Sequence, residues 1–287
     1  MQDQLRQTCR RLLEEGQVQV VIGYGQNGGG PAYPVFITRP EDADQLVWND
    51  RCFANLTTYL KRKEIRSLGK AAVVVKACDE RALVVLEKES QIDRGGLVVI
   101  GVACHGAARL REPKCESCES PLPRRVDISI TPADAPLAGR QSAAATPAKD
   151  RFAALDAFLE KPPAERMAFW QQELARCVKC YACRQACPLC YCERCIVDKN
   201  RPTAIDTSAT LKGNFAWHIT RAFHLAGRCI GCDECTRVCP AKIDLRLLNL
   251  SLARAAEANF GYRPGVDPAA EPVLGSFSAH DQESFIR

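Results

Sequence analysis

Two short blocks of four cysteines constrain this chain more than any other feature of its sequence. They are CVKCYACRQACP, Cys177 to Pro188, and CIGCDECTRVCP, Cys229 to Pro240. Both have the spacing C-x2-C-x2-C-x3-C followed by proline. Cysteines scattered at random, 17 in 287 residues, would not produce this spacing twice. The two blocks are therefore repeated units with a shared role.

The spacing is that of the cysteine ligands of paired 4Fe–4S clusters. Three closely spaced thiolates can hold three irons of one cube from a single loop, and the fourth, one helical turn further on, points toward the other cube. We therefore expect one cluster on Cys177, Cys180, Cys183 and Cys239, and a second on Cys229, Cys232, Cys235 and Cys187. Zinc is the alternative for soft thiolates, although structural zinc sites usually use two separate C-x2-C pairs.

Eight of the remaining nine cysteines form two further candidate groups. We expect a third cluster on Cys52, Cys104, Cys115 and Cys118. Cys115 and Cys118 form a C-x2-C pair, Cys104 follows an expected strand, and Cys52 precedes a helical stretch. The dense run CPLCYCERC predicts a fourth site that would join both halves of the chain, on Cys78, Cys190, Cys192 and Cys195. Buried reduced thiols are the alternative for both groups, and a plain thiol is the interpretation for Cys9.

Residues 1–130 predict an α/β domain. A helix is expected at Gln2–Glu14, and further helical stretches at Cys52–Arg62 and Glu80–Glu89, with Asp79 as an N-cap. Apolar runs predict strands at Val18–Ile22, Ala71–Val75, Leu97–Val102 and Val126–Ile130. Strands that alternate with helices favour a parallel or mixed sheet.

Residues 131–150 are rich in Ala, Pro, Ser and Thr and predict a linker, with an ordered surface crossing as the alternative. Residues 151–262 predict a mainly α-helical, ferredoxin-like domain that carries the two 4Fe–4S clusters. Its helices are expected at residues 152–159, 164–176, 215–225 and 245–255, with a stop at Gly261. Residues 263–287 predict a polar C-terminal tail.

A glycine motif in the first half has the spacing of a dinucleotide-binding site, but no helix is expected after it. Gly23, Gly25 and Gly28 fit G-x-G-x-x-G after an apolar run, yet Gly29, Gly30 and Pro31 follow. A dinucleotide site needs a helix there, because the helix N-terminus holds the pyrophosphate. A flexible loop near a flavin or a partner surface is therefore the favoured interpretation.

Composition excludes several other classes of protein. The 39 basic and 34 acidic residues are dispersed, which does not indicate a nucleic-acid partner. The longest near-apolar stretch, Leu97–Cys104, is too short to span a membrane. The N-terminus has acidic residues and no apolar core of a secretory signal. Abundant cysteine without a signal favours metal binding and a cytoplasmic location.

Cations near the blocks are candidates for adjusting cluster potentials. These are Lys179, Arg184, Arg228 and Arg237, with solvated surface charge as the alternative. His218 and His224 lie on the expected helix before the second block, and packing or capping is the favoured role for both.

Several segments resemble known families. Five segments within residues 15–130 resemble the beta subunits of coenzyme F-420-reducing hydrogenases and formate dehydrogenases. They are VIGYGQ, LVWNDRCFANLTTYL, VVVKACDERALVVLEKE, VVIGVACHG and KCESCESPLP. The cysteine blocks and AWHITRAFHLAG between them resemble the α-helical ferredoxin domains of heterodisulfide reductase and of fumarate or succinate oxidoreductase iron–sulfur subunits.

The resemblance implies an iron–sulfur electron-transfer subunit of a cytoplasmic oxidoreductase complex of anaerobic metabolism. Such a subunit has no catalytic residue of its own and relays electrons between a catalytic subunit and a flavoprotein or heterodisulfide-reductase-like subunit. The resemblance also implies FAD, in this chain or in a partner. The alternatives are a flavin-dependent reductase that acts directly on coenzyme F-420 or a similar hydride carrier, and a scaffold or regulator with structural clusters.

Overall fold

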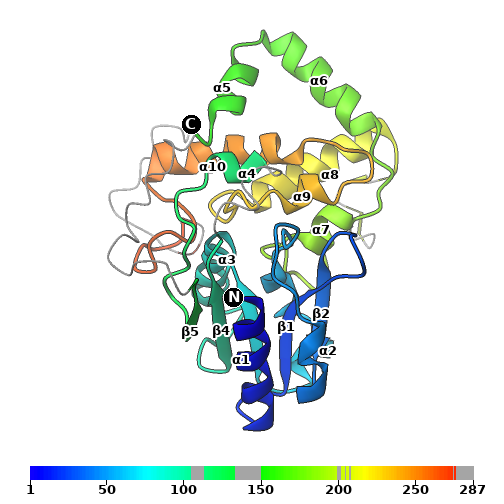
Figure 1. Cartoon of the computed structure of the whole chain (residues 1–287). Coiled ribbons are helices and arrows are strands. Elements are labelled where there is room, and N and C mark those ends of the chain that lie inside the picture. The colour runs from blue at the N-terminus through cyan, green and yellow to red at the C-terminus, as the bar shows by residue number, and fades with distance from the viewer. Residues whose placement is uncertain are drawn as a thin grey trace. The chain divides into compact units, whose positions relative to one another are not determined.

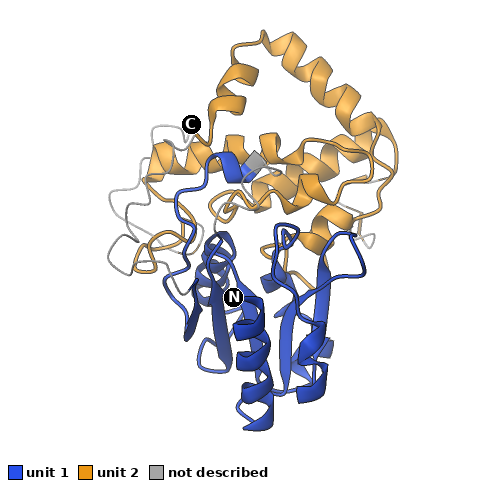
Figure 2. Ribbon diagram, viewed as in Figure 1, with its two compact units in different colours: residues 1–149 blue, residues 150–287 orange. Residues whose placement is uncertain are grey.

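The computed structural model describes residues 1–104, 113–132, 150–198, 202–203, 205–206, 208–273 and 275. The chain divides into two compact units, Met1–Lys149 and Asp150–Arg287, which Figure 2 distinguishes by colour. Most of the predicted linker, residues 133–149, lies outside the described residues, as do residue 274 and residues 276–287 of the predicted tail. Each unit is described by itself.

Unit 1 contains a mixed five-stranded sheet in the order β2-β1-β3-β4-β5 (Figure 1). The strands are β1 (Val20–Gly25), β2 (Tyr33–Ile37), β3 (Ala71–Val75), β4 (Leu97–Val102) and β5 (Ile128–Ile130). β2 pairs antiparallel with β1, and the other neighbouring pairs are parallel. Strands β1 and β3 are buried along their whole length, which explains why they read as continuous apolar runs. The predicted α/β unit with a mixed sheet is confirmed.

The glycine run forms part of a hairpin. Gly23 and Gly25 lie within β1, and the chain turns back into β2, so that Gly25 is paired with Tyr33. Gly28 lies in the turn with a φ of +54°, a backbone conformation that glycine adopts without strain. A strand follows the run where a dinucleotide site would need a helix, so the expectation that no helix starts there is confirmed.

The helices of unit 1 agree with prediction in part. They are α1 (Gln2–Glu14), α2 (Lys63–Arg66), α3 (Ala77–Lys88) and α4 (Pro113–Glu116), with 3-10 helices η1 (Pro40–Gln45) and η2 (Leu56–Tyr59). The single helix predicted over residues 52–62 is wrong. The Asn55 side chain accepts hydrogen bonds from the amide and the hydroxyl of Thr57, and this local bonding competes with an α-helix.

The start of α3 also differs from prediction. The N-cap is Lys76, not Asp79. Asp79 lies in the first turn, where its carboxylate accepts a hydrogen bond from the Lys76 backbone amide at 3.1 Å. This is the reciprocal part of a capping box, and it leaves the acidic side chain near the positive end of the helix dipole.

Unit 2 is built from helices and loops in its described part. The helices are α5 (Ala153–Leu159), α6 (Pro163–Ala175), α7 (Ala182–Ala186), α8 (Leu211–His224), α9 (Glu234–Arg237) and α10 (Leu245–Phe260), with η5 (Ile196–Asp198). The four predicted helices correspond to α5, α6, α8 and α10. α10 ends at Gly261, whose φ is +60°. α8 packs against α6 and α10, and the buried Trp217 of α8 contributes to the core.

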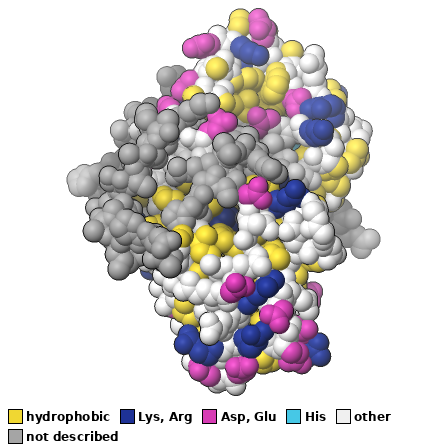
Figure 3. Space-filling view, viewed as in Figure 1, with side chains coloured by type: hydrophobic (Ala, Val, Ile, Leu, Met, Phe, Trp, Pro, Cys, Tyr) yellow, Lys and Arg dark blue, Asp and Glu magenta, His cyan; other side chains and the backbone are white. Residues whose placement is uncertain are grey.

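Charges of both signs share the surface of unit 1. On the face that Figure 3 shows, Lys and Arg side chains are interspersed with Asp and Glu side chains, in keeping with the small net charge. Within the described ranges, no helix is long and apolar enough to cross a membrane.

Candidate functional site

The two cysteine blocks follow the same backbone path. Two residues and four residues after the first cysteine, the backbone is left-handed, with φ of +56° and +58° at Lys179 and Tyr181, and +70° and +64° at Gly231 and Asp233. A short helix then begins, α7 in one block and α9 in the other. Backbone of this kind curls and can point successive amides into a concave surface that favours anions. Three of these four residues are not glycine, which is a strained choice typical of functional loops.

The first cavity has about 380 Å³ of empty space, open solvent included, and is lined by three cysteines of the first block and the last cysteine of the second. These are Cys177, Cys180, Cys183 and Cys239. Trp217 and His218 of α8 form one wall, and Ile243 and Leu245 form another. The structure thus brings together the four cysteines that the spacing predicts for one cluster.

The second cavity has about 410 Å³ of empty space, open solvent included. It is lined by three cysteines of the second block and the last cysteine of the first. Its cysteines are Cys229, Cys232, Cys235 and Cys187. Arg221 of α8 and Asn249 of α10 also line it. Because α7 packs against α9, the last cysteine of each block reaches the cavity of the other block.

The residues present fit a 4Fe–4S cluster in each cavity. Among the described side chains, no three His, Cys, Asp or Glu residues converge closely enough to hold a single metal ion. A cube of irons and sulfides takes four thiolates, and four cysteines line each cavity. Soft thiolate donors and curled backbone loops suit such a cube.

A buried cation lies between the sulfurs of both blocks. Arg221 is 4% exposed, and its Nη2 donates to the backbone oxygen of Cys183 at 3.1 Å. Burial opposes its charge, but the sulfurs of Cys187, Cys183 and Cys235 raise its pKa above the ordinary value, so that it stays protonated. Burial raises the pKa of the Cys183 thiol to about 11, an effect that Arg221 opposes.

One side chain donor lies beside a cysteine sulfur in each cavity. His218 Nε2 is 3.3 Å from the Sγ of Cys177, and Asn249 Nδ2 donates to the Sγ of Cys235 at 3.4 Å. Burial, with the charges of Arg221 and Lys179, lowers the pKa of His218 to about 3. A hydrogen bond from His218 to the sulfur requires the tautomer that is protonated at Nε2.

Of the cations predicted near the blocks, Lys179 lines the first cavity, and its charge opposes the rise in the pKa of Cys177. Arg184 pairs with Asp198 at 2.9 Å and Arg237 with Glu234 at 2.6 Å, so carboxylates offset both charges. The Lys179 amine lies 3.4 Å from the Gly213 carbonyl, and the Arg228 guanidinium stacks on Tyr191. His224 is exposed.

Sequence reasoning missed Arg221 and Asn249. For Arg221 the signal was present in FAWHITRAFH, where this arginine follows Trp217 by four residues and so shares its helix face. A charge on the buried face of a helix requires a countercharge, and the cysteine blocks are the nearest candidates in the sequence.

The cysteines of unit 1 form a looser group around Cys104. The sulfurs of Cys52, Cys78 and Cys118 lie near enough to interact electrostatically with that of Cys104. Burial raises the pKa of Cys52 to about 11 and that of Cys78 to about 12. Cys115 belongs to α4, and its carbonyl accepts a hydrogen bond from the Cys118 amide at 3.3 Å.

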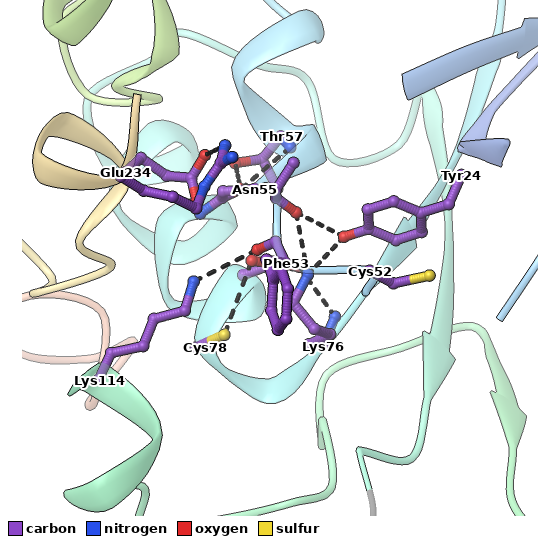
Figure 4. A network of polar contacts seen from close by, with 12 residues as sticks. Tyr24, Cys52, Phe53, Asn55, Thr57, Lys76, Cys78, Lys114 and Glu234 are labelled. Carbon is purple, nitrogen blue, oxygen red and sulfur yellow. Dashed lines mark hydrogen bonds and ion pairs between the residues drawn. The ribbon is translucent and has the colours of Figure 1, made fainter. Parts of the chain in front are cut away.

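Cys52 and Cys78 differ in orientation. The Cys52 sulfur accepts a hydrogen bond from the Asn49 amide at 3.4 Å, and in Figure 4 it points away from Cys78. The Lys114 charge acts on Cys78 and on Cys104, and Lys114 is next to Cys115. Cys78, which the sequence assigned to another group, thus lies near Cys104 and Lys114.

The other members of the predicted fourth site lie in unit 2. Cys192 is exposed, whereas Cys190 and Cys195 are half-buried. Burial raises the pKa of Cys195, and the Cys190 sulfur adds to this shift, so these two thiols are neighbours. Since Cys78 belongs to unit 1, the site that combines it with these three cysteines stays a prediction.

A buried polar network adjoins the cysteines of unit 1. Lys76 Nζ forms an ion pair with Asp79 Oδ2 at 2.6 Å and donates to the Ala54 carbonyl at 3.0 Å and to the Tyr24 hydroxyl (Figure 4). Lys76 follows β3, and Tyr24 is near the end of β1. The network therefore links the carboxyl ends of two parallel strands to the loop that carries Cys52. Burial raises the pKa of Cys52 and of Cys104, and the Lys76 charge opposes this rise.

Asn214 attaches the first block to α8, and its removal should weaken unit 2. Its Nδ2 donates to the carbonyls of Leu174 at 3.0 Å and Cys177 at 2.8 Å. Asn214→Ala leaves both buried carbonyls without this donor, and we expect the free energy of unfolding to fall by about 1–3 kcal/mol. Denaturant titration of the anaerobic protein measures this. Asn259→Ala, on the exposed part of α10, is the matched control, and an equal loss in both variants would contradict the assignment.

Two formate dehydrogenase beta subunits are among the known proteins that this chain resembles. The F420-dependent formate dehydrogenase subunit beta of Methanocaldococcus jannaschii is 32% identical over 106 residues, which cover 37% of this chain and 27% of that protein. The F420-dependent formate dehydrogenase 1 subunit beta of Methanococcus maripaludis is 22% identical over an alignment of 354 positions, which covers 92% of this chain and 90% of that protein. No family model matches the sequence. The similarity to the first relative thus spans about a quarter of that protein's length, and the chain as a whole resembles the beta subunits of F420-dependent formate dehydrogenases.

Proposed function

We propose that this chain is an iron–sulfur electron-transfer subunit of a cytoplasmic anaerobic oxidoreductase complex, of formate dehydrogenase, hydrogenase or heterodisulfide-reductase type. It relays electrons between a catalytic subunit and a flavin or reductase subunit. The observation that carries the proposal is the pair of cavities, each lined by three cysteines of one block and the last cysteine of the other. The names of the two relatives support the formate dehydrogenase type.

The proposed ligands of the two clusters are the eight block cysteines in their two crossed sets. A 4Fe–4S cluster supplies one-electron transfer when it is bound. The chain supplies the thiolates, the curled loops around them and the apolar walls, such as Trp217, Ile243 and Leu245, that exclude water. With a cysteine for every iron, no position stays open for substrate, which supports relay over bond chemistry.

A further cluster is proposed in unit 1 on Cys104, Cys115 and Cys118 with one more cysteine. Cys52 is the fourth ligand that the sequence predicts, and Cys78 is the one that its closeness to Cys104 and Lys114 favours. The two choices predict different results. Cys78→Ser removes the iron of this cluster if Cys78 is the ligand, whereas Cys52→Ser then leaves it in place.

The second candidate function is that of a flavin-dependent reductase acting directly on coenzyme F-420. The relatives' names, which contain "F420-dependent", favour it. It requires a flavin on this chain, and the glycine hairpin of β1 and β2 does not provide a helix N-terminus for its pyrophosphate. Flavin that stays with the purified chain and is reduced by reduced coenzyme F-420 would favour this candidate over the relay.

Metal and redox analysis of the anaerobically purified full chain tests the proposed function. We expect about eight irons from the two blocks, with further iron from unit 1, and an EPR spectrum of two interacting clusters after reduction. We also expect the chain to co-purify from its native cells with a catalytic oxidoreductase subunit. Zinc in place of iron, or clusters that no biological electron donor reduces, would contradict the relay.

A further inference from the structure

Helix α8 presents two buried polar side chains to two different cavities. His218 is 2% exposed and lines the first cavity, with Nε2 3.3 Å from the Cys177 sulfur. Arg221, three residues later and 4% exposed, lines the second cavity. Residues three apart lie on neighbouring parts of one helix face, so a single helix contacts both proposed clusters.

The charge of Arg221 has sulfur neighbours from both blocks. Its Nη2 is bound to the Cys183 carbonyl in the first block, and the sulfurs of Cys187, Cys183 and Cys235 are the charges that act on it most. Within the described part of the chain, Arg221 has no carboxylate partner, and its Nε is buried without a hydrogen-bond partner. A buried cation without a countercharge is strongly unfavourable, so these surroundings indicate anionic occupants of the cavities.

The second cavity has its own neutral donor on another helix. Asn249 of α10 donates to the Cys235 sulfur at 3.4 Å, and Cys235 lines only the second of the two cavities. His218 contacts a sulfur of the first cavity alone. Each cavity thus has a neutral side chain of its own beside a cysteine sulfur, and the Arg221 charge lies near sulfurs of both blocks.

We propose that Arg221 is a positioning residue that raises the reduction potentials of both clusters together, while His218 raises only that of the first cluster and Asn249 only that of the second. Reduction adds one electron to a cluster that is already negative. A nearby cation or a hydrogen bond to a thiolate stabilises the reduced form more than the oxidised form. This inference rests on the proposed function, because it requires both clusters.

An EPR-monitored redox titration of the full holoprotein tests the inference. In Arg221→Met, we expect the ratio of reduced to oxidised cluster at a fixed ambient potential to fall about tenfold for both clusters, which is about 59 mV for one electron. In His218→Phe only the first cluster shifts, and in Asn249→Leu only the second shifts. Cys239→Ser and Cys187→Ser, which each retain one cluster, assign the signals. Arg221→Lys keeps the charge and should restore part of the shift.

Matched controls separate this pattern from a general loss of structure. His224→Phe changes an exposed histidine of the same helix, and Arg254→Met removes an arginine that pairs with Asp156 on the surface. Both should leave the potentials unchanged. A second measurement uses the metal-free chain, in which Arg221→Met should raise the midpoint of thermal unfolding, because it removes an uncompensated buried charge.

Two outcomes overturn the inference. One is full iron content in Arg221→Met with both potentials unchanged or with only one shifted. The other is a metal-free Arg221→Met chain that is less stable than the metal-free parent, which would show that Arg221 stabilises the fold without any cluster. A parent chain without redox-active iron would instead contradict the proposed function, so the two failures are distinguishable.

Discussion

Cys187→Ser should remove the cluster of the second block and leave that of the first block intact. Cys187 belongs to the first block in the sequence but lines the cavity of Cys229, Cys232 and Cys235. Serine is a poor ligand for iron, so we expect the iron bound by the two blocks to fall by about half. Iron and sulfide analysis, with EPR of the reduced protein, measures this.

Cys239→Ser tests the same exchange of ligands from the second block. Cys239 belongs to the second block and lines the first cavity, so this variant should lose the cluster of Cys177, Cys180 and Cys183. Cys9→Ala is the matched control, since Cys9 is buried in α1 of unit 1 and contacts neither cavity. Loss of the first-block cluster in Cys187→Ser, with the second retained, would show that the ligands are not crossed and would contradict the assignment.

Lys76→Met should destabilise unit 1 by about 3–5 kcal/mol, because it leaves the carboxylate of Asp79 buried without its cation. Asp79 is 0% exposed, and its ion pair with Lys76 is 2.6 Å long. The substitution also removes the donor to the Ala54 carbonyl. Hydrogen exchange of amides in β1 and β3 measures the effect on unit 1 itself, since a chain of two units need not unfold in one transition.

A second substitution separates the loss of charge balance from the loss of packing. In Lys76→Met with Asp79→Asn, residue 79 is neutral but keeps an oxygen that can accept from the residue 76 amide. We expect this double variant to recover most of the lost stability. Lys70→Met, at an exposed lysine, is the control and should change stability by less than about 0.5 kcal/mol. A double variant no more stable than Lys76→Met would rule out the buried carboxylate as the cause.

Local features of the sequence predicted local structure well. The helix over Gln2–Glu14 and the strand over Ala71–Val75 have the bounds that their apolar patterns indicated. The spacing of the cysteine blocks also predicted which cysteines line each cavity, because the left-handed residues and the short helix that follow from it are encoded within a few residues. Ligation itself stays a prediction that Cys187→Ser and Cys239→Ser test.

Features that depend on distant contacts were missed. Strand β2, YPVFI, contains a proline and is only partly buried, and its pairing with β1 is what makes it a strand. The closeness of Cys78 to Cys104 follows from the adjacency of β3 and β4, which each cysteine follows in the sequence. The shared position of Arg221 depends on the packing of α8 beside both blocks, and no pattern within one block encodes it.

The exchange of last cysteines between the blocks also determines when each cavity is completed during synthesis of the chain. While a ribosome has released the chain only as far as residue 228, three cysteines of the first cavity are present, but the wall formed by Cys239, Ile243 and Leu245 is still unmade. Of the four cysteines of the second cavity, only Cys187 is present at that stage. The linings of both cavities are complete only when about residue 250 has emerged, so the two cavities are finished almost simultaneously.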